Sequence, residues 1–134
     1  MSLDVGAEPL SNVAYVHDGT TEGLLSAIFQ AYALHEQPDD FSTETALQPR
    51  LGQSLRYIET DAALAARVKA GIVRKAGRDA WDVVLYASLS DDPSAGVAIY
   101  RFVRHIMATP AAANGGLIRN MAHPIAGPVA RLDR

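Results

Sequence analysis

The chain has 134 residues, of which 49% are hydrophobic, with no cysteine and a formal net charge of −3. This composition suits one folded domain, and it excludes disulfide bonds, thiolate metal sites and cysteine nucleophiles within the chain. No run of roughly 18 apolar residues is present and the first residues lack the pattern of a secretory signal, so we expect a cytoplasmic protein that does not enter the membrane.

Residues 1–12 form a flexible leader in our interpretation, because glycine, proline, serine and asparagine are frequent there. The apolar run Val13–Val16 predicts a short strand, which ends at the turn "HDGT". Apolar residues then recur every three to four positions, which indicates a helix. We expect this helix to begin at a cap formed by Thr20 or Thr21 and to end near His35.

The stretch "PDDFSTETALQPRLGQS" is polar, and we interpret it as a loop. The segment Leu55–Thr60 after it predicts a second short strand. Isolated strands must pair to satisfy their backbone groups. The sequence therefore predicts a small two-stranded β-ribbon that joins Val13–Val16 with Leu55–Thr60.

The rest of the chain is helical in pattern. The predicted helices run from Thr60 or Asp61 to Lys75, from Asp79 to Ser90, from Ser94 to Ala108, and around Leu117–Met121. The fold class is thus mainly helical α+β, a bundle of about five helices with the small ribbon, in a single domain over residues 13–134. The last segment, "GPVARLDR", starts like a helix and stops after about two turns, so we expect either a frayed end or the N-terminal part of a longer polypeptide.

The turn "HDGTTEG" offers His17 and Asp18 as candidate catalytic residues. Its glycine spacing matches neither GxGxxG nor GxxxxGK[ST], so neither nucleotide-binding fingerprint is present. Neighbouring residues on a strand point to opposite faces, and Asp-Gly pairs commonly build turns. The alternatives are therefore a reactive pair or a structural corner between strand and helix, and the residue types favour the corner.

No metal site or cofactor is predicted. The stretch "HEQPD" differs from the HExxH zinc motif, because Asp39 replaces the second histidine and Pro38 interrupts the helix. The carboxylates Asp39, Asp40 and Glu44 are interpreted as a solvated acidic loop rather than an acid–base pair. No catalytic constellation stands out, which leaves open whether the chain is an enzyme.

Charge is unevenly distributed: residues 1–65 hold ten acidic residues against two arginines, and residues 66–134 hold ten basic residues against five acidic ones. Several cations share predicted helix faces and form a candidate basic face for DNA or a partner protein. Its residues are Arg67, Arg74, Lys75, Arg101, Arg104, His105 and Arg119. The alternative is an ordinary solvated face that pairs with the acidic half.

Three stretches, "YVHDGTTEGLLSAIFQAY", "LRYIETDAALAARV" and "AIYRFVRHI", resemble a bacterial family of DNA metabolism proteins whose own activity is undefined. The resemblance covers about residues 13–134. Members of that family are encoded beside a radical-SAM protein of DNA repair or modification, and some are fused to a uracil-DNA glycosylase-like domain.

The resemblance implies an accessory or adaptor domain that binds a partner enzyme, DNA or both through the basic face. One alternative is an enzyme that acts on a nucleotide or nucleic acid through the His17–Asp18 turn. Another is a structural N-terminal domain that packs on the glycosylase-like domain. The sequence does not indicate an oligomeric state.

Overall fold

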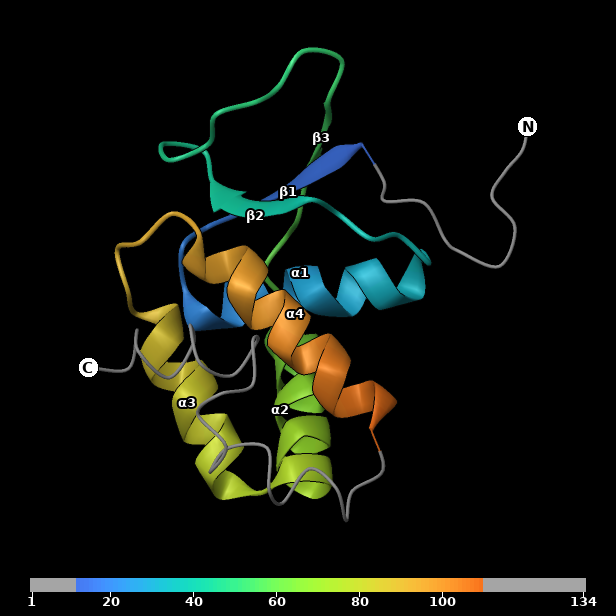
Figure 1. Cartoon of the computed structure of the whole chain (residues 1–134), viewed down its shortest axis with the longest axis vertical. Coiled ribbons are helices and arrows are strands. Elements are labelled where there is room, and N and C mark those ends of the chain that lie inside the picture. Colours follow the sequence, from blue (N-terminus) through green and yellow to red (C-terminus); the bar gives the residue numbers. More distant parts are fainter. Residues whose placement is uncertain (1–11, 110–134) are drawn as a thin grey trace.

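The computed structural model describes residues 12–109, which hold four helices and three strands (Figure 1). In chain order these elements are β1 (Val13–His17), α1 (Thr21–Ala33), β2 (Asp40–Thr43), β3 (Ser54–Tyr57), α2 (Ala62–Ala76), α3 (Arg78–Ser88) and α4 (Ala95–Ala108). Residues 1–11 of the predicted leader lie outside the described residues, as do the predicted helix at Leu117–Met121 and Arg119. No helix within residues 12–109 is long and apolar enough to span a membrane.

The three strands form one parallel sheet in the order β2-β1-β3. Tyr15 on the central strand lies opposite Phe41 on one side and Arg56 on the other. The prediction of a two-stranded ribbon is therefore wrong. The two predicted strands do pair, but as parallel neighbours, and β2 adds a third strand on the opposite edge of β1. Because α1 connects the parallel strands β1 and β2, the class is α/β with a helical majority rather than α+β.

Strand β2 lies in the segment that we interpreted as a polar loop. Its one large apolar residue is Phe41, which is 1% exposed. The Phe41 ring lies between those of Tyr15 and Tyr100, at centroid distances of 5.4 and 4.5 Å. This aromatic stack across three elements holds the strand in place, and local sequence carries little sign of it.

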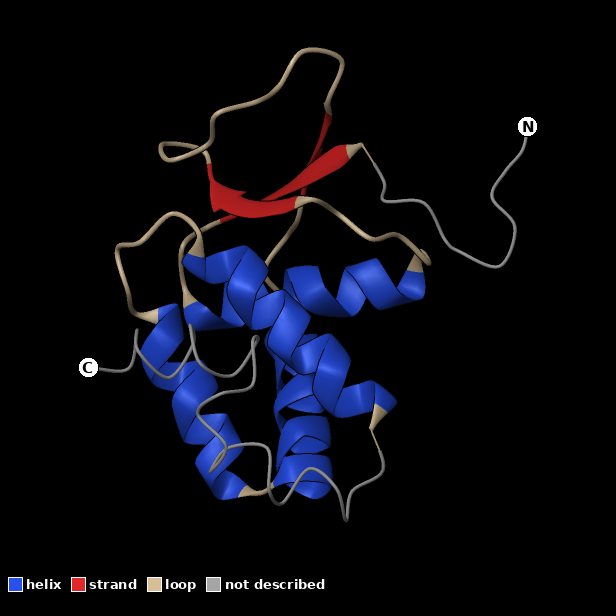
Figure 2. Cartoon of the chain, viewed as in Figure 1, coloured by secondary structure: helices blue, strands red, loops and turns tan. Residues whose placement is uncertain are grey.

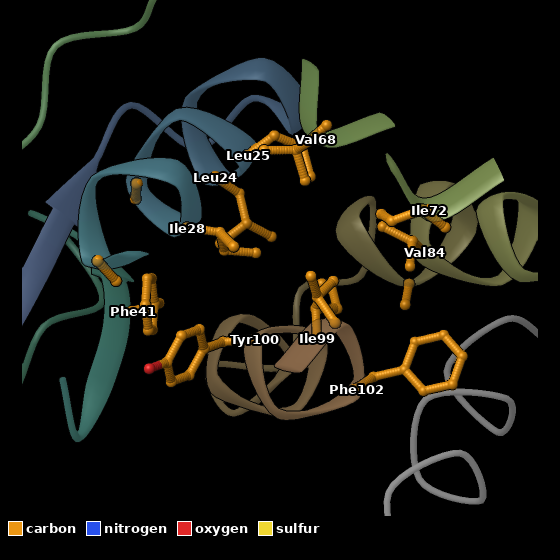
Figure 3. Close-up of a cluster of buried hydrophobic side chains, with 14 of the residues drawn as sticks. Leu24, Leu25, Ile28, Phe41, Val68, Ile72, Val84, Ile99, Tyr100 and Phe102 are labelled. Carbon is orange, nitrogen blue, oxygen red and sulfur yellow. The ribbon is translucent and has the colours of Figure 1, made fainter. Parts of the chain in front are cut away.

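The sheet lies on one side of the helices (Figure 2). Helices α1 and α4 contact its strands, whereas α2 and α3 pack on the side away from it. The core between the helices draws on every one of them, as Figure 3 shows for Ile28, Ile72, Val84 and Ile99. These residues belong to the apolar faces expected from periodicity, whereas Leu89, which follows the last residue of α3, is 67% exposed.

The predicted helix caps at the starts of α1 and α2 are confirmed. The hydroxyl of Thr20 accepts a hydrogen bond from the backbone N–H of Gly23 over 2.9 Å. The Asp61 carboxylate accepts one from the N–H of Ala63, also over 2.9 Å. Gly77 ends α2 with φ of 91°, a backbone angle that favours glycine.

Candidate functional site

Both carboxylate oxygens of Asp18 accept hydrogen bonds within the fold. Its carboxylate accepts from the backbone N–H of Thr20 over 2.9 Å and from the hydroxyl of Thr20 over 2.6 Å. The hydroxyl of Thr60 donates to its other oxygen over 2.6 Å. The bonds from Thr20 and Thr60 lower the pKa of Asp18 to about 2. Asp18 is therefore a structural residue that joins the turn before α1 to the segment before α2.

The glycines of "HDGTTEG" serve the same corner. Gly19 has φ of 90°, which L side chains rarely adopt. A Cβ added to Gly23 would lie 2.1 Å from Oδ1 of Asp18, closer than any side chain allows. The turn thus needs glycine at both positions for reasons of backbone and packing, which supports the structural interpretation.

His17 and Asp18 do not form a pair. Nδ1 of His17 accepts a hydrogen bond from the N–H of Gly19 over 3.1 Å, so the neutral ring carries its proton on Nε2. Burial lowers the pKa of His17 below its usual value of 6.5, and the nearby negative charge of Asp18 only partly opposes this. His17 is thus a neutral hydrogen-bond donor at Nε2, and in this tautomer Nε2 cannot accept a proton as a base.

His17 nevertheless lines a cavity of about 310 Å³. The carboxyl ends of β1 and β2 and the starts of α1 and α4 lie on the same side of the molecule and surround it (Figure 1). In parallel sheets, the edge formed by the carboxyl ends of the strands is the usual place for a ligand site. The site is not apparent from the sequence, because His17, Thr43 and Asp91–Asp92 come from segments far apart in the chain. Recognition of β2, and hence of the βαβ unit, would have indicated it.

The predicted basic face is only partly assembled. Arg101, Arg104 and His105 line one shallow hollow of about 360 Å³, together with residues 37–39, Tyr100 and Ala108. We call this the α4 hollow. Nη1 of Arg104 donates to the hydroxyl of Tyr100 over 3.1 Å, and the guanidinium lies 5.8 Å from the centre of that ring. This contact holds the Arg104 side chain along the helix, while Arg101 is exposed.

The other cations of the predicted face have different surroundings. The guanidinium of Arg67 lies 5.0 Å from the centre of the Phe29 ring, which places it against α1. Lys75 donates from Nζ to the backbone carbonyl of Met107 over 2.8 Å and so joins α2 to the end of α4. Arg74 is exposed on α2 and does not line the α4 hollow. Of the six residues of the predicted basic face that the structure describes, three therefore line one hollow together.

The acidic residues near this region are engaged in structure. Asp39 accepts from Arg50 and, over 2.8 Å, from Nε2 of Gln53. Asp40 belongs to β2, and burial raises its pKa above the usual value. Across residues 12–109, no three histidine, aspartate or glutamate side chains are close enough together to hold a metal ion.

Comparison with known proteins adds no relative: no family model matches the chain, and no match is found among curated proteins or solved structures. The resemblance to the DNA metabolism family is therefore carried by the three sequence stretches alone. Any function drawn from it is a proposal.

Proposed function

We propose that this chain is a binding module of a bacterial DNA repair or modification system, which docks on a partner enzyme through the α4 hollow. The observation that supports this most is the gathering of Arg101, Arg104 and His105 around one hollow of α4. Two guanidinium groups placed in this way attract an acidic surface and orient it during association.

The composition of the α4 hollow favours a protein partner over DNA. Ala108 gives it exposed apolar area beside the two arginines, and arginine is enriched among the residues that dominate protein interfaces. A DNA-binding protein commonly neutralises several phosphates with a run of cations, and proteins that do so are usually basic. Here the net charge is −3 and Asp39 lies in the same hollow.

The partner that the resemblance suggests is the radical-SAM protein or the glycosylase-like domain. An adaptor domain and a structural domain packed on the glycosylase would both use this surface, so the same experiment tests both hypotheses. The enzymatic alternative has less support, because the hydrogen bonds of Asp18 and the tautomer of His17 give them structural roles.

A pull-down followed by calorimetry with the neighbouring radical-SAM protein tests the proposal. Arg101→Glu should weaken binding at least tenfold, and Arg101→Glu with Arg104→Glu should abolish it. The matched control is Arg67→Glu with Arg74→Glu, which makes the same charge change away from the hollow. Thermal melts should accompany the Arg104 variant, because that residue also contacts Tyr100.

Two results would refute the proposal. One is equal loss of binding in both double variants, which would indicate a general charge effect. The other is steeply salt-dependent binding of duplex DNA that Arg101→Glu removes, without any binding of the partner protein. That result would assign the hollow to phosphates instead.

A further inference from the structure

The cavity at the carboxyl edge of the sheet, called the edge cavity below, is separate from the α4 hollow and has a different chemistry. Three parts of the chain form its walls: the turn after β1 with the start of α1, the end of β2 with the loop after it, and the end of α3 with the following loop and the start of α4. Its volume of about 310 Å³ falls at the lower end of the range for small-molecule sites.

The walls of the edge cavity are held in fixed positions. A Cβ added to Gly96 would lie 2.3 Å from the backbone oxygen of Phe41, so the start of α4 lies directly against β2. On the opposite wall, the Asp18 hydrogen bonds fix the turn that carries His17 and Gly19. A preformed site of this kind loses little conformational entropy when a ligand binds.

The polar groups of the edge cavity are of two kinds. His17 can donate from Nε2, since its Nδ1 accepts from Gly19. Asp91 and Asp92 provide carboxylate acceptors on the facing loop. Oδ1 of Asp92 accepts from the N–H and the hydroxyl of Ser94 over 2.9 and 2.8 Å, while Oδ2 has no hydrogen-bond partner within residues 12–109. The exposed Ala46 and Pro93 supply apolar surface, above a floor of the buried side chains Leu24, Phe41 and Ile99.

This distribution of charge selects the kind of ligand. Among residues 12–109, no lysine or arginine lines the edge cavity, and its two carboxylates disfavour phosphate or carboxylate groups inside it. The starts of α1 and α4 also border it, and the partial positive charge of helix N-termini offsets the carboxylates and disfavours a cation. A neutral ligand with both donors and acceptors meets neither penalty.

We propose that the edge cavity binds a small neutral ligand with vicinal hydroxyl groups, either a free sugar or the ribose of a nucleoside. The adjacent hydroxyls donate to Asp91 and Asp92, and an oxygen of the ligand accepts from Nε2 of His17. The carbon face of the sugar ring lies on the apolar surface, and Thr43 offers a further hydroxyl at the wall.

An NMR titration of the ¹⁵N-labelled protein tests this proposal, with D-ribose, adenosine and 2′-deoxyadenosine as probes. Ribose or adenosine should shift the amide signals of Gly19, Thr43 and Gly96. The deoxynucleoside, which lacks the vicinal pair, should bind at least tenfold more weakly than adenosine. Binding of ribose with an affinity like that of adenosine identifies a free sugar as the ligand type, and binding of adenosine alone identifies a nucleoside.

The carboxylates are tested by Asp91→Asn with Asp92→Asn, which should reduce the affinity at least tenfold. Asparagine at position 92 keeps an acceptor for Ser94, so the loop is preserved. Asp79→Asn is the control. It removes a charge in the first turn of α3, at the opposite end of that helix from the loop that carries Asp91 and Asp92. Arg101→Glu should leave ribose and adenosine binding unchanged. Failure of the ligand proposal can therefore be distinguished from failure of the proposed partner binding at the α4 hollow.

Three outcomes would overturn the proposal. The first is no shift of these amides by ribose or adenosine up to about 10 mM, a range that detects even millimolar affinity. The others are equal affinity for adenosine and 2′-deoxyadenosine, and larger shifts of the same amides with inorganic phosphate or spermidine. Retained affinity in the Asp91→Asn, Asp92→Asn variant would contradict the role of the carboxylates.

Discussion

The hydroxyl of Thr60 donates a hydrogen bond to the carboxylate of Asp18 over 2.6 Å, although 42 residues separate them in the chain. A second link lies beside it: Oγ of the buried Ser26 accepts from the backbone N–H of Asp61 over 2.9 Å. Together these bonds fasten the start of α2 to the turn before α1 and to α1 itself. They give the "HDGT" turn a role in tertiary structure, since the two helices pack along each other.

Asp18→Ala removes three hydrogen bonds and should lower the free energy of unfolding by about 1–2 kcal/mol. Urea denaturation followed by circular dichroism measures the change. Glu59→Ala, at an exposed residue of the neighbouring segment, is the matched control and should change stability by less than about 0.5 kcal/mol. Equal losses in the two variants would contradict a specific role for Asp18.

The same carboxylate should make stability depend on acid. Its pKa is lowered from the usual 3.8 to about 2 by hydrogen bonds that exist only in the folded protein. A lowered folded-state pKa means that the stabilisation is complete above pH 4 and disappears as the pH falls from about 4 to 2. Urea midpoints measured across this window should fall less steeply for Asp18→Asn than for the wild type. Parallel curves would show that other carboxyl groups cause the acid sensitivity.

Two glycine substitutions should have opposite effects. Gly23→Ala places a Cβ 2.1 Å from Oδ1 of Asp18, and displacement of that carboxylate should cost about 1–3 kcal/mol. Gly71→Ala in α2 brings its Cβ to 3.0 Å from the terminal methyl of Met107, a flexible side chain that can move. Because alanine favours the helix more than glycine does, this variant should gain up to about 1 kcal/mol. Thermal melts distinguish the two, and a loss of stability in Gly71→Ala would show that Met107 is tightly confined.

The sequence predicted the four helices of residues 12–109 well and the sheet poorly, for a physical reason. Each helix carries an apolar face over ten or more residues, and its signal is local. Strand β2 has four residues and depends on Phe41 meeting Tyr15 and Tyr100 from other elements. Because β2 was not recognised, the parallel strand order could not be predicted. The edge cavity between β2 and α4 was missed for the same reason. The α4 hollow was predicted in part, because Arg101, Arg104 and His105 are close together on one helix, whereas the surroundings of Arg67 and Lys75 depend on packing.

A buried hydroxyl provides the last prediction. Tyr15 is 0% exposed and donates its hydroxyl to Glu36, which also accepts from Nε and Nη2 of Arg56 over 3.1 and 2.8 Å. Glu36→Ala should cost about 1–3 kcal/mol, since it leaves the tyrosine hydroxyl without this acceptor. In a Tyr15→Phe background the hydroxyl is absent, so the same substitution should cost at least about 0.5 kcal/mol less. A double-mutant cycle in urea measures this coupling. Strictly additive losses would mean that the Glu36 contact with Arg56, rather than the one with Tyr15, carries the stabilisation of the β1–β3 edge.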